Sequence, residues 1–257
     1  MKKLIFFLIV NLFLIQTNAQ APDIEWQKSL GGSGDEYAYS IQQTTDGGYI
    51  VAGSSWSNDG DVSGNHGWLD YWVVKLDSTG NIQWQESLGG SSSERALSIQ
   101  QTTDSGYIVA GWSGSNDGDV TGNHGSWDYW IVKLDSAGDI EWEKSLGGSN
   151  GGGWDENSGD VAYSIQQTTD GGYIVAGYSD SIDGDVIGNH GGYDYWIVKL
   201  DGIGNIEWQK SLGGSSYDGA SSIQQTTDGG YIVAGESSSN DGDVTGNHGD
   251  VDYWIEK

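Results

Sequence analysis

The chain of 257 residues contains no cysteine and a single proline. Without cysteine, disulfide bonds and thiolate metal centres are excluded. The scarcity of proline excludes a collagen-type triple helix, although 43 glycines are present. Basic residues are also few, because 10 Lys and Arg stand against 37 Asp and Glu and leave a net charge of −27. Contacts to phosphate need basic side chains, so we expect no nucleic-acid partner.

Aromatic residues, in contrast, are plentiful, with 13 Trp and 14 Tyr. Acidic chains that remain disordered contain few aromatic residues, because they cannot bury enough apolar surface to fold. The composition therefore favours a folded, glycine-rich and acidic protein.

Residues 1–21 have the features of a secretory signal peptide. Two lysines precede an apolar run from Leu4 to Ile15, and small residues follow it. The run is shorter than the roughly 20 apolar residues that span a bilayer. We expect this segment to be removed on export, no membrane span after its removal, and a secreted or cell-surface location in a bacterium.

The rest of the sequence consists of four copies of one repeat. The phrase IQQTTDGGYIVAG begins at Ile41 and returns, with one substitution, at Ile99, Ile165 and Ile223, so the repeat steps are 58, 66 and 58 residues. An insertion near residues 150–157 accounts for the longer step. Repeats of this period indicate a solenoid, a propeller or a related array. We expect a single four-repeat domain over residues 22–257.

Each copy carries the signals of four short strands. In the first copy, Tyr39–Thr44 and Tyr49–Gly53 flank an Asp-Gly turn and predict a hairpin. Tyr71–Asp77 and Asn81–Ser87 flank a second glycine turn and predict another. A long polar loop, Ser54–Asp70, separates the two hairpins, and no stretch has a helical period with caps.

The second and third strands of each copy are apolar on both faces, which is typical of sheets packed between two other sheets. Four such sheets arranged radially predict an all-β fold, a β-propeller of four four-stranded blades. Ile24–Leu30 matches the fourth strand of a unit, and Asp252–Lys257 matches the third. We expect these two segments to pair and close the ring, because pairing protects both edges. The alternative is an open part of a longer array.

Two phrases carry a resemblance to known repeats. Asp46–Gly53, DGGYIVAG, resembles the core of bacterial delta-60-type and kelch-like propeller repeats. Leu76–Trp84 is similar to the tryptophan-docking hairpin of quinoprotein-type propellers, with one fewer residue between Asp and Gly. The whole unit, over residues 24–257, resembles repeats in secreted or cell-surface proteins of gliding-type bacteria that use the type IX route. The resemblance implies a propeller and an extracellular site, and it implies no fixed activity.

The acidic loop of each copy resembles a calcium-binding loop. In the window from Asp59 to Asp70, side chains with oxygen stand at positions 1, 3, 5 and 12, and Gly64 stands at position 6. The alternative is a turn-rich loop in which Asp, Asn and Gly serve only backbone geometry. The third copy has Ile187 at position 5 and supplies one ligand fewer. The expected calcium ligands are Asp59, Asp61, Ser63, Asp70, Asp117, Asp119, Thr121, Asp128, Asp183, Asp185, Asp194, Asp241, Asp243, Thr245 and Asp252.

Aromatic residues stand at loop positions that differ most between the copies. Loops tolerate change and carry binding, and aromatic side chains beside polar ones suit a polysaccharide or a cell-surface protein. Neutral drift in loops is the alternative interpretation. The candidate ligand-binding residues are Trp56, Trp68, Trp112, Trp127, Trp154, Tyr178 and Tyr193.

Two further columns of residues favour architecture over chemistry. The histidines in the Asn-His-Gly phrase, such as His66, are flanked by glycine and fit solvent-exposed turns. The acidic column that begins with Glu36 and Glu94 repeats in four equivalent places, whereas catalysis usually needs inequivalent groups. The chain has no Gly-x-Ser-x-Gly elbow, Walker loop or His-Glu-x-x-His phrase.

The sequence therefore predicts a secreted or cell-surface repeat protein that acts as a binding or structural, adhesion-like module. Calcium is the expected cofactor. One alternative is a lectin-like propeller that binds carbohydrate, and another is a hydrolase or lyase on a propeller scaffold.

Overall fold

The computed structural model describes residues 21–149 and 159–257, which form 15 antiparallel β-strands. The predicted signal peptide, apart from Ala21, and most of the insertion in the third copy lie outside the described residues. The prediction of an all-β fold is confirmed for the part that is described. Within these two ranges, no helix is long and apolar enough to cross a membrane.

The strands form four sheets, each of which runs through its strands in chain order. The first sheet consists of β1 (Glu36–Gln43), β2 (Tyr49–Ser55), β3 (Asp70–Leu76) and β4 (Ile82–Leu88). The second consists of β5 (Glu94–Gln101), β6 (Tyr107–Ser113), β7 (Asp128–Leu134) and β8 (Ile140–Leu146). The third consists of β9 (Val161–Gln167), β10 (Tyr173–Ser179), β11 (Asp194–Leu200) and β12 (Ile206–Leu212). The fourth consists of β13 (Asp218–Gln225), β14 (Tyr231–Ser237) and β15 (Asp252–Glu256).

The predicted hairpins are confirmed at the first turn of each sheet, which is Asp-Gly in three copies and Asp104-Ser105 in the second. In the first copy, the Asp46 carboxylate accepts hydrogen bonds from the Thr44 hydroxyl and the Gly48 amide. Gly47 has φ of 83°, a left-handed conformation that glycine adopts without steric cost. The buried ammonium of Lys75 on β3 lies 2.8 Å from the Asp46 carboxylate, so the turn is tied to the third strand.

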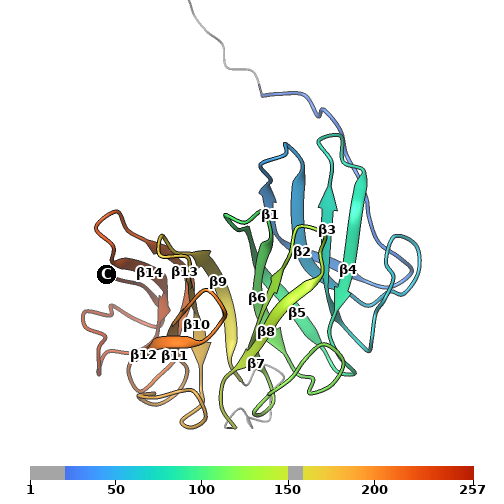
Figure 1. Ribbon diagram of the computed structural model, residues 1–257. Helices are drawn as coiled ribbons and strands as arrows, with labels where there is room; N and C mark the ends of the chain where they lie inside the picture. Colours follow the sequence, from blue (N-terminus) through green and yellow to red (C-terminus); the bar gives the residue numbers. More distant parts are fainter. Residues whose placement is uncertain (1–20, 150–158) are drawn as a thin grey trace, which may run out of the picture.

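The sheets follow one another as blades, in a propeller-like arrangement (Figure 1). The innermost strands β1, β5, β9 and β13 pack on one another in succession. One cluster of buried apolar side chains fills each of the three interfaces between neighbouring sheets. The prediction that the central strands are covered on both faces is confirmed for β6, β7, β10 and β11, which are buried throughout. It is wrong for β14 and β15, because one face of the fourth sheet has no neighbour.

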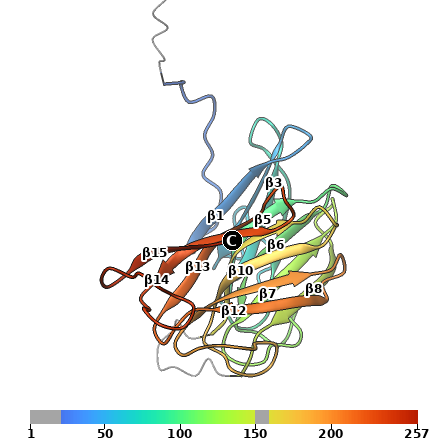
Figure 2. The same cartoon turned by 90° about the vertical axis from the view of Figure 1, so that its left-hand side faces the viewer.

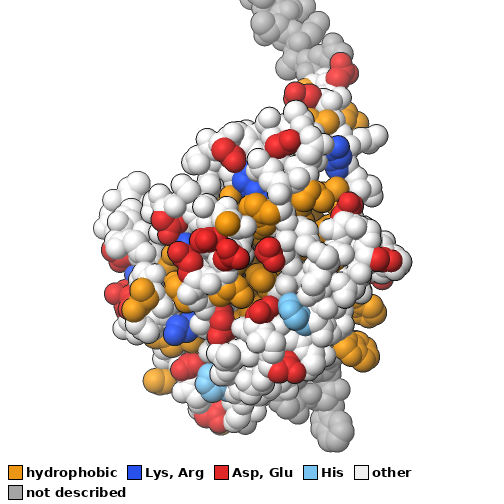
Figure 3. Space-filling view, turned by 45° about the vertical axis from the view of Figure 1, so that its right-hand side comes forward, with side chains coloured by type: hydrophobic (Ala, Val, Ile, Leu, Met, Phe, Trp, Pro, Cys, Tyr) orange, Lys and Arg blue, Asp and Glu red, His pale blue; other side chains and the backbone are white. Residues whose placement is uncertain are grey.

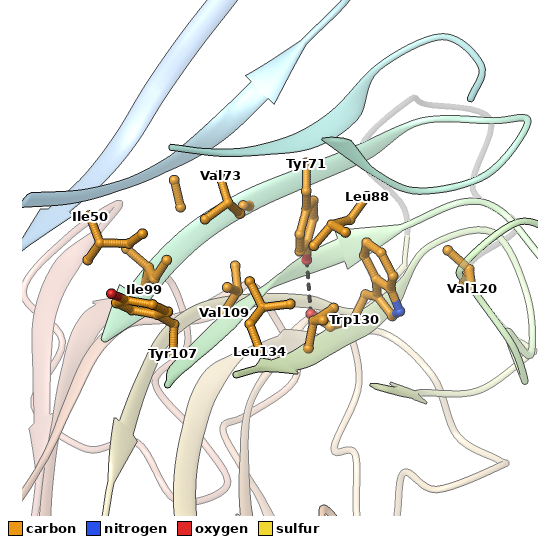
Figure 4. Close-up of a cluster of buried hydrophobic side chains, with 13 residues drawn as sticks. Ile50, Tyr71, Val73, Leu88, Ile99, Tyr107, Val109, Val120, Trp130 and Leu134 are labelled. Atoms are coloured by element: carbon orange, nitrogen blue, oxygen red, sulfur yellow. Dashed lines mark hydrogen bonds between the residues drawn. The ribbon is translucent and has the colours of Figure 1, made fainter. Parts of the chain in front are cut away.

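Each interface between sheets contains the same tyrosine. The Tyr71 hydroxyl on β3 donates a hydrogen bond of 2.9 Å to the Trp130 carbonyl on β7, and the two rings pack 4.6 Å apart (Figure 4). Tyr129 and Tyr195 repeat the contact at the next two interfaces, with hydroxyl–carbonyl distances of 2.9 and 3.0 Å. A buried hydroxyl that donates to a buried carbonyl satisfies two polar groups at once.

The last glycine of the repeated phrase makes room for this tyrosine. A Cβ atom on Gly177 would lie 1.8 Å from the Val161 carbonyl oxygen and 2.8 Å from the Tyr129 hydroxyl. The strands β9 and β10 also change register at this point. Any side chain larger than that of glycine would therefore force the two strands and the tyrosine apart.

The predicted ring closure is not present in this structure. The fourth sheet has three strands, and Ile24–Leu30 forms no strand and does not pair with β15. Those residues lie against the first sheet instead, where the Trp26 ring packs 5.6 Å from the Tyr49 ring. The same interface repeated three times leaves the first and fourth sheets at opposite ends of the arc (Figure 1).

Candidate binding site

An aromatic pocket of about 660 Å³ opens where the second and third sheets meet. A pocket of this size suits a small molecule or a few units of a polymer. Strands β5 and β9 supply one part of its lining, and β6 and β10 supply another. Trp127 comes from the loop that precedes β7, and one residue comes from β1. The lining residues are Tyr39, Arg95, Leu97, Trp112, Trp127, Val161, Tyr163 and Tyr178.

The pocket is built from positions at which the four copies differ. Trp112 on β6 corresponds to Ser54, Tyr178 and Glu236 in the other copies. Such differences stand out because the strands around them are nearly identical. The strands of the scaffold are therefore nearly the same in all four copies, whereas the side chains at one end of the sheets differ from copy to copy.

The aromatic rings form a continuous surface. The indoles of Trp112 and Trp127 stack with their centroids 4.2 Å apart and their planes at 21°. The Tyr178 ring lies 5.0 Å from the Tyr193 ring, and Tyr217 packs against both tyrosines. Burial raises the pKa of the Tyr178 phenol well above its ordinary value, so its hydroxyl stays protonated.

Arg95 is the only arginine of the chain, and it lies in this pocket. Its guanidinium carbon lies 5.7 Å from the centre of the Tyr39 ring and 5.6 Å from that of Trp112, within the range of cation–π attraction. The Nε atom is buried and has no hydrogen-bond partner among the described residues. A buried donor without an acceptor is costly, so the packing of the two rings against the guanidinium has to offset that cost.

The structure brings together some of the candidate ligand-binding residues. Trp112, Trp127 and Tyr178 line the pocket, and Tyr193 extends its aromatic surface. Trp56 and Trp68 are exposed and do not line it, and Trp154 lies outside the described residues. Sequence reasoning missed the pocket residues Tyr39, Arg95 and Tyr163 and the adjoining Tyr217. They also vary between copies, but they lie on or beside the first strands and not in the variable loops.

The carboxylates of the acidic loops hold backbone amides. Asp117 accepts from the Ser91 amide at 2.7 Å, and Asp119 accepts from the Gly89 amide at 3.1 Å. Asp128 is buried at the start of β7 and accepts from the amide and the ring nitrogen of His124. The other copies repeat these contacts. The predicted ligands thus serve different parts of the loop, and no group of three or more acidic or histidine side chains that would hold a metal lies within residues 21–149 and 159–257.

The histidine column bridges neighbouring sheets. Nδ1 of His66 lies 2.8 Å from the Asp70 carboxylate in its own copy. Its Nε2 lies 3.9 Å from Asp119 in the next copy. His124 and His190 make the equivalent pairs, so these histidines do not gather around one metal.

The acidic column at the starts of the first strands is buried and structural. Asp160 accepts from the Gly148 amide at 2.9 Å and from the Ser181 hydroxyl at 3.1 Å. The pKa of Asp160 is raised to about 7, mainly by burial and also by the nearby Asp128 carboxylate, and the hydrogen bonds to Asp160 oppose both effects. One oxygen of Asp160 and one of Asp128 are buried without a hydrogen-bond partner among the described residues.

No protein-family model matches the chain, and no curated protein matches it. The functional argument therefore rests on the geometry of the pocket.

The raised pKa of Asp160 can be tested by measuring how the stability of the protein depends on pH. The folded protein keeps the proton on Asp160 up to about pH 7, whereas the unfolded chain loses it near the ordinary aspartate pKa of 3.8. The folded state binds more protons in this window, so the free energy of unfolding falls as pH rises from about 4 to about 7. The contribution of one group has a slope of at most about 1.4 kcal/mol per pH unit.

Asp160→Asn removes this titration. We expect the free energy of unfolding of the variant to rise relative to that of the wild type as pH increases from about 4 to about 7. Urea unfolding at several pH values measures both. If the free energies of unfolding of the two proteins change with pH in parallel, the raised pKa of Asp160 is contradicted.

Proposed function

We propose that the protein is a secreted or cell-surface binding module whose ligand occupies the aromatic pocket. The observation that carries the proposal is the position of Arg95, the only arginine of the chain, whose guanidinium lies in the pocket lining beside the rings of Tyr39 and Trp112. The signal-peptide pattern and the resemblance to surface proteins of gliding-type bacteria support the location.

An acidic polysaccharide is the ligand that best fits these groups. The stacked indoles of Trp112 and Trp127 offer flat apolar faces to the C–H face of a sugar ring. The tyrosine hydroxyls offer hydrogen bonds to sugar hydroxyls, and Arg95 offers a charge-assisted bond to a carboxylate. The rest of the surface repels anions, since acidic side chains outnumber basic ones on the face shown in Figure 3. A single cation in an aromatic setting would therefore select where an anionic ligand binds.

Binding is favoured over catalysis by the chemistry of the lining. Hydrolysis of a glycoside uses two carboxyl groups beside the scissile bond. No Asp or Glu is among the described residues that line the pocket. The hydrolase alternative therefore has no support from the described lining of this site.

The closed four-bladed propeller stays a prediction. It is supported by a hollow that residues of all four first strands line together. The residues that line it include Ile41, Ile99, Ile165 and Ile223. The contact between two copies proposed below is the alternative to closure within one chain.

Binding of oligogalacturonate tests the proposed function. We expect Trp112→Ala and Arg95→Gln each to weaken the affinity at least about tenfold, because each removes one of the two recognition elements, an effect of about 1.4 kcal/mol. Isothermal titration calorimetry measures the affinity. A neutral oligosaccharide of the same length should bind more weakly than the acidic one, and Arg95→Gln should reduce that difference.

Trp68→Ala is the matched control, because Trp68 is exposed and lies outside the pocket lining. It should bind as the wild type does. Equal losses in Trp68→Ala and Trp112→Ala, or no binding of either sugar by the folded wild type, would overturn the assignment of the pocket to acidic polysaccharide.

Calcium in the acidic loops also stays a prediction. If the loops bind calcium, the melting temperature should be higher with calcium than with a chelator, because binding to the folded state alone stabilises it. Asp117→Asn and Asp119→Asn should reduce this difference. An identical melt under both conditions would show that the carboxylates serve only the backbone amides.

A further inference from the structure

Each interface between sheets joins two different faces. We call the face that a sheet turns toward the next sheet its forward face, and the opposite one its backward face. In the first interface, the forward face of the first sheet presents Ile50, Ala52, Tyr71 and Val73. The backward face of the second sheet presents Val120, Trp130, Val132 and Leu134 (Figure 4). The second and third interfaces repeat this arrangement with the corresponding residues.

The forward face of the fourth sheet has no neighbour. Tyr253 occupies the position of Tyr71, Tyr129 and Tyr195, which have no exposed surface, yet Tyr253 is 93% exposed. Ile255, on the same face of β15, is also exposed. Figure 2, viewed from the side of this sheet, shows β14 and β15 with no described sheet in front of them.

The backward face of the first sheet is the matching half. Val62, Trp72, Val74 and Leu76 form an apolar cluster there, and they correspond to the four backward-face residues of the second sheet. A groove of about 390 Å³ runs over this cluster and is lined on one side by residues 26–30.

The innermost strand of the first sheet, β1, also lacks the neighbouring sheet that covers its counterparts. Ile41 is 65% exposed, whereas its counterparts Ile99, Ile165 and Ile223 are buried by the preceding sheet.

The polar groups of the two faces also correspond. At an internal interface, the Gln101 amide donates to Gln42 Oε1 at 2.6 Å, and the Ile99 amide donates to Ser40 Oγ at 3.2 Å. By the same register, the forward face of the fourth sheet offers Gln224 Oε1 and Ser222 Oγ. The backward face of the first sheet offers the amides of Gln43 and Ile41, and the Trp72 carbonyl for the Tyr253 hydroxyl.

The charges correspond as well. The Lys133 ammonium contacts Glu141 on the fourth strand of its sheet at 2.7 Å, and Lys199 contacts Glu207 at 2.8 Å. Lys257 is the counterpart of these lysines, and Glu25 is the counterpart of their partners. In the histidine column, His248 is largely exposed, and the aspartate that corresponds to its partner is Asp61.

We propose that two copies of this chain associate head to tail, with the forward face of the fourth sheet of one copy on the backward face of the first sheet of the other. Residues 24–30 of the second copy then add to β15 as a fourth strand of that sheet, by β-augmentation. The contact uses two different surfaces, so it is heterologous and can extend to further copies.

A second copy fits this contact without any change in the chain. The first and fourth sheets of one chain lie at opposite ends of the arc, joined through three buried interfaces, and Ile24–Leu30 does not pair with β15 there (Figure 1). Addition of another copy repeats the existing interface and leaves all three unchanged. It also covers the open edge of β15 and the exposed side chains of Tyr253, Ile255 and Ile41.

Cysteine cross-linking tests the proposal, because the natural chain has no cysteine. In the first sheet, Val73 pairs with Glu86, and the corresponding pair across the proposed contact is Ile255 with Lys28. We expect an equimolar mixture of the single variants Ile255→Cys and Lys28→Cys to form a disulfide-linked heterodimer under mild oxidation. Mass spectrometry of chains with different tags distinguishes it from homodimers.

Gln27→Cys is the matched control, since neighbouring residues of a strand point to opposite faces. Its mixture with Ile255→Cys should give roughly a tenth or less of the heterodimer, because only a correctly placed pair benefits from a high effective concentration. Sedimentation velocity of the uncross-linked wild type should show association that rises with protein concentration and is lost in Tyr253→Asp.

Two results would overturn the proposal. One is a heterodimer yield no higher with Lys28→Cys than with Gln27→Cys. The other is a wild type that stays monomeric while the double variant Lys28→Cys/Ile255→Cys forms its disulfide within one chain, which would establish ring closure instead.

Discussion

The hydrogen bond from a buried tyrosine hydroxyl to a tryptophan carbonyl of the next sheet is the contact on which this structure depends. Tyr71, Tyr129 and Tyr195 each make it, and the apolar cluster of each interface surrounds one of them. The contact leaves no space for a side chain at the last glycine of the repeated phrase, such as Gly177 on β10. It therefore fixes how neighbouring sheets pack, and it explains why the sequence of the strands varies so little between copies.

Because the interfaces between sheets are constant, the four copies differ in sequence mainly at the ends of the strands and in the loops. At one end, Trp112, Trp127 and Tyr178 create an aromatic surface between the second and third sheets. Arg95, the only arginine of this acidic protein, adds a positive charge to that surface. A repeated scaffold thus acquires a single distinct site through a few substitutions, without any change in its core.

Much of the fold could be predicted from the sequence, because local signals specify it. The Asp-Gly turns and the apolar strands predict the two hairpins of every copy, and the spacing of Ile41 and its counterparts predicts four sheets. The arrangement of the ends could not be predicted in this way, since pairing of Ile24–Leu30 with β15 depends on the angle between sheets, which no local signal encodes. The pocket was found only in part, because Arg95 and Tyr163 reach it from first strands that are distant in sequence from Trp127. The roles of Asp117 and Asp119 also depend on amides from another part of the chain.

The most direct test of the repeated interface is the free energy of unfolding of four Tyr→Phe variants, measured by urea denaturation at a protein concentration too low for association. Tyr71→Phe, Tyr129→Phe and Tyr195→Phe should each lose about 1 to 3 kcal/mol, because each leaves a buried carbonyl without its donor. Tyr253→Phe should lose nothing, since its side chain is exposed. An equal loss in Tyr253→Phe would contradict the open arc, and no loss in the other three would contradict the role of the tyrosine.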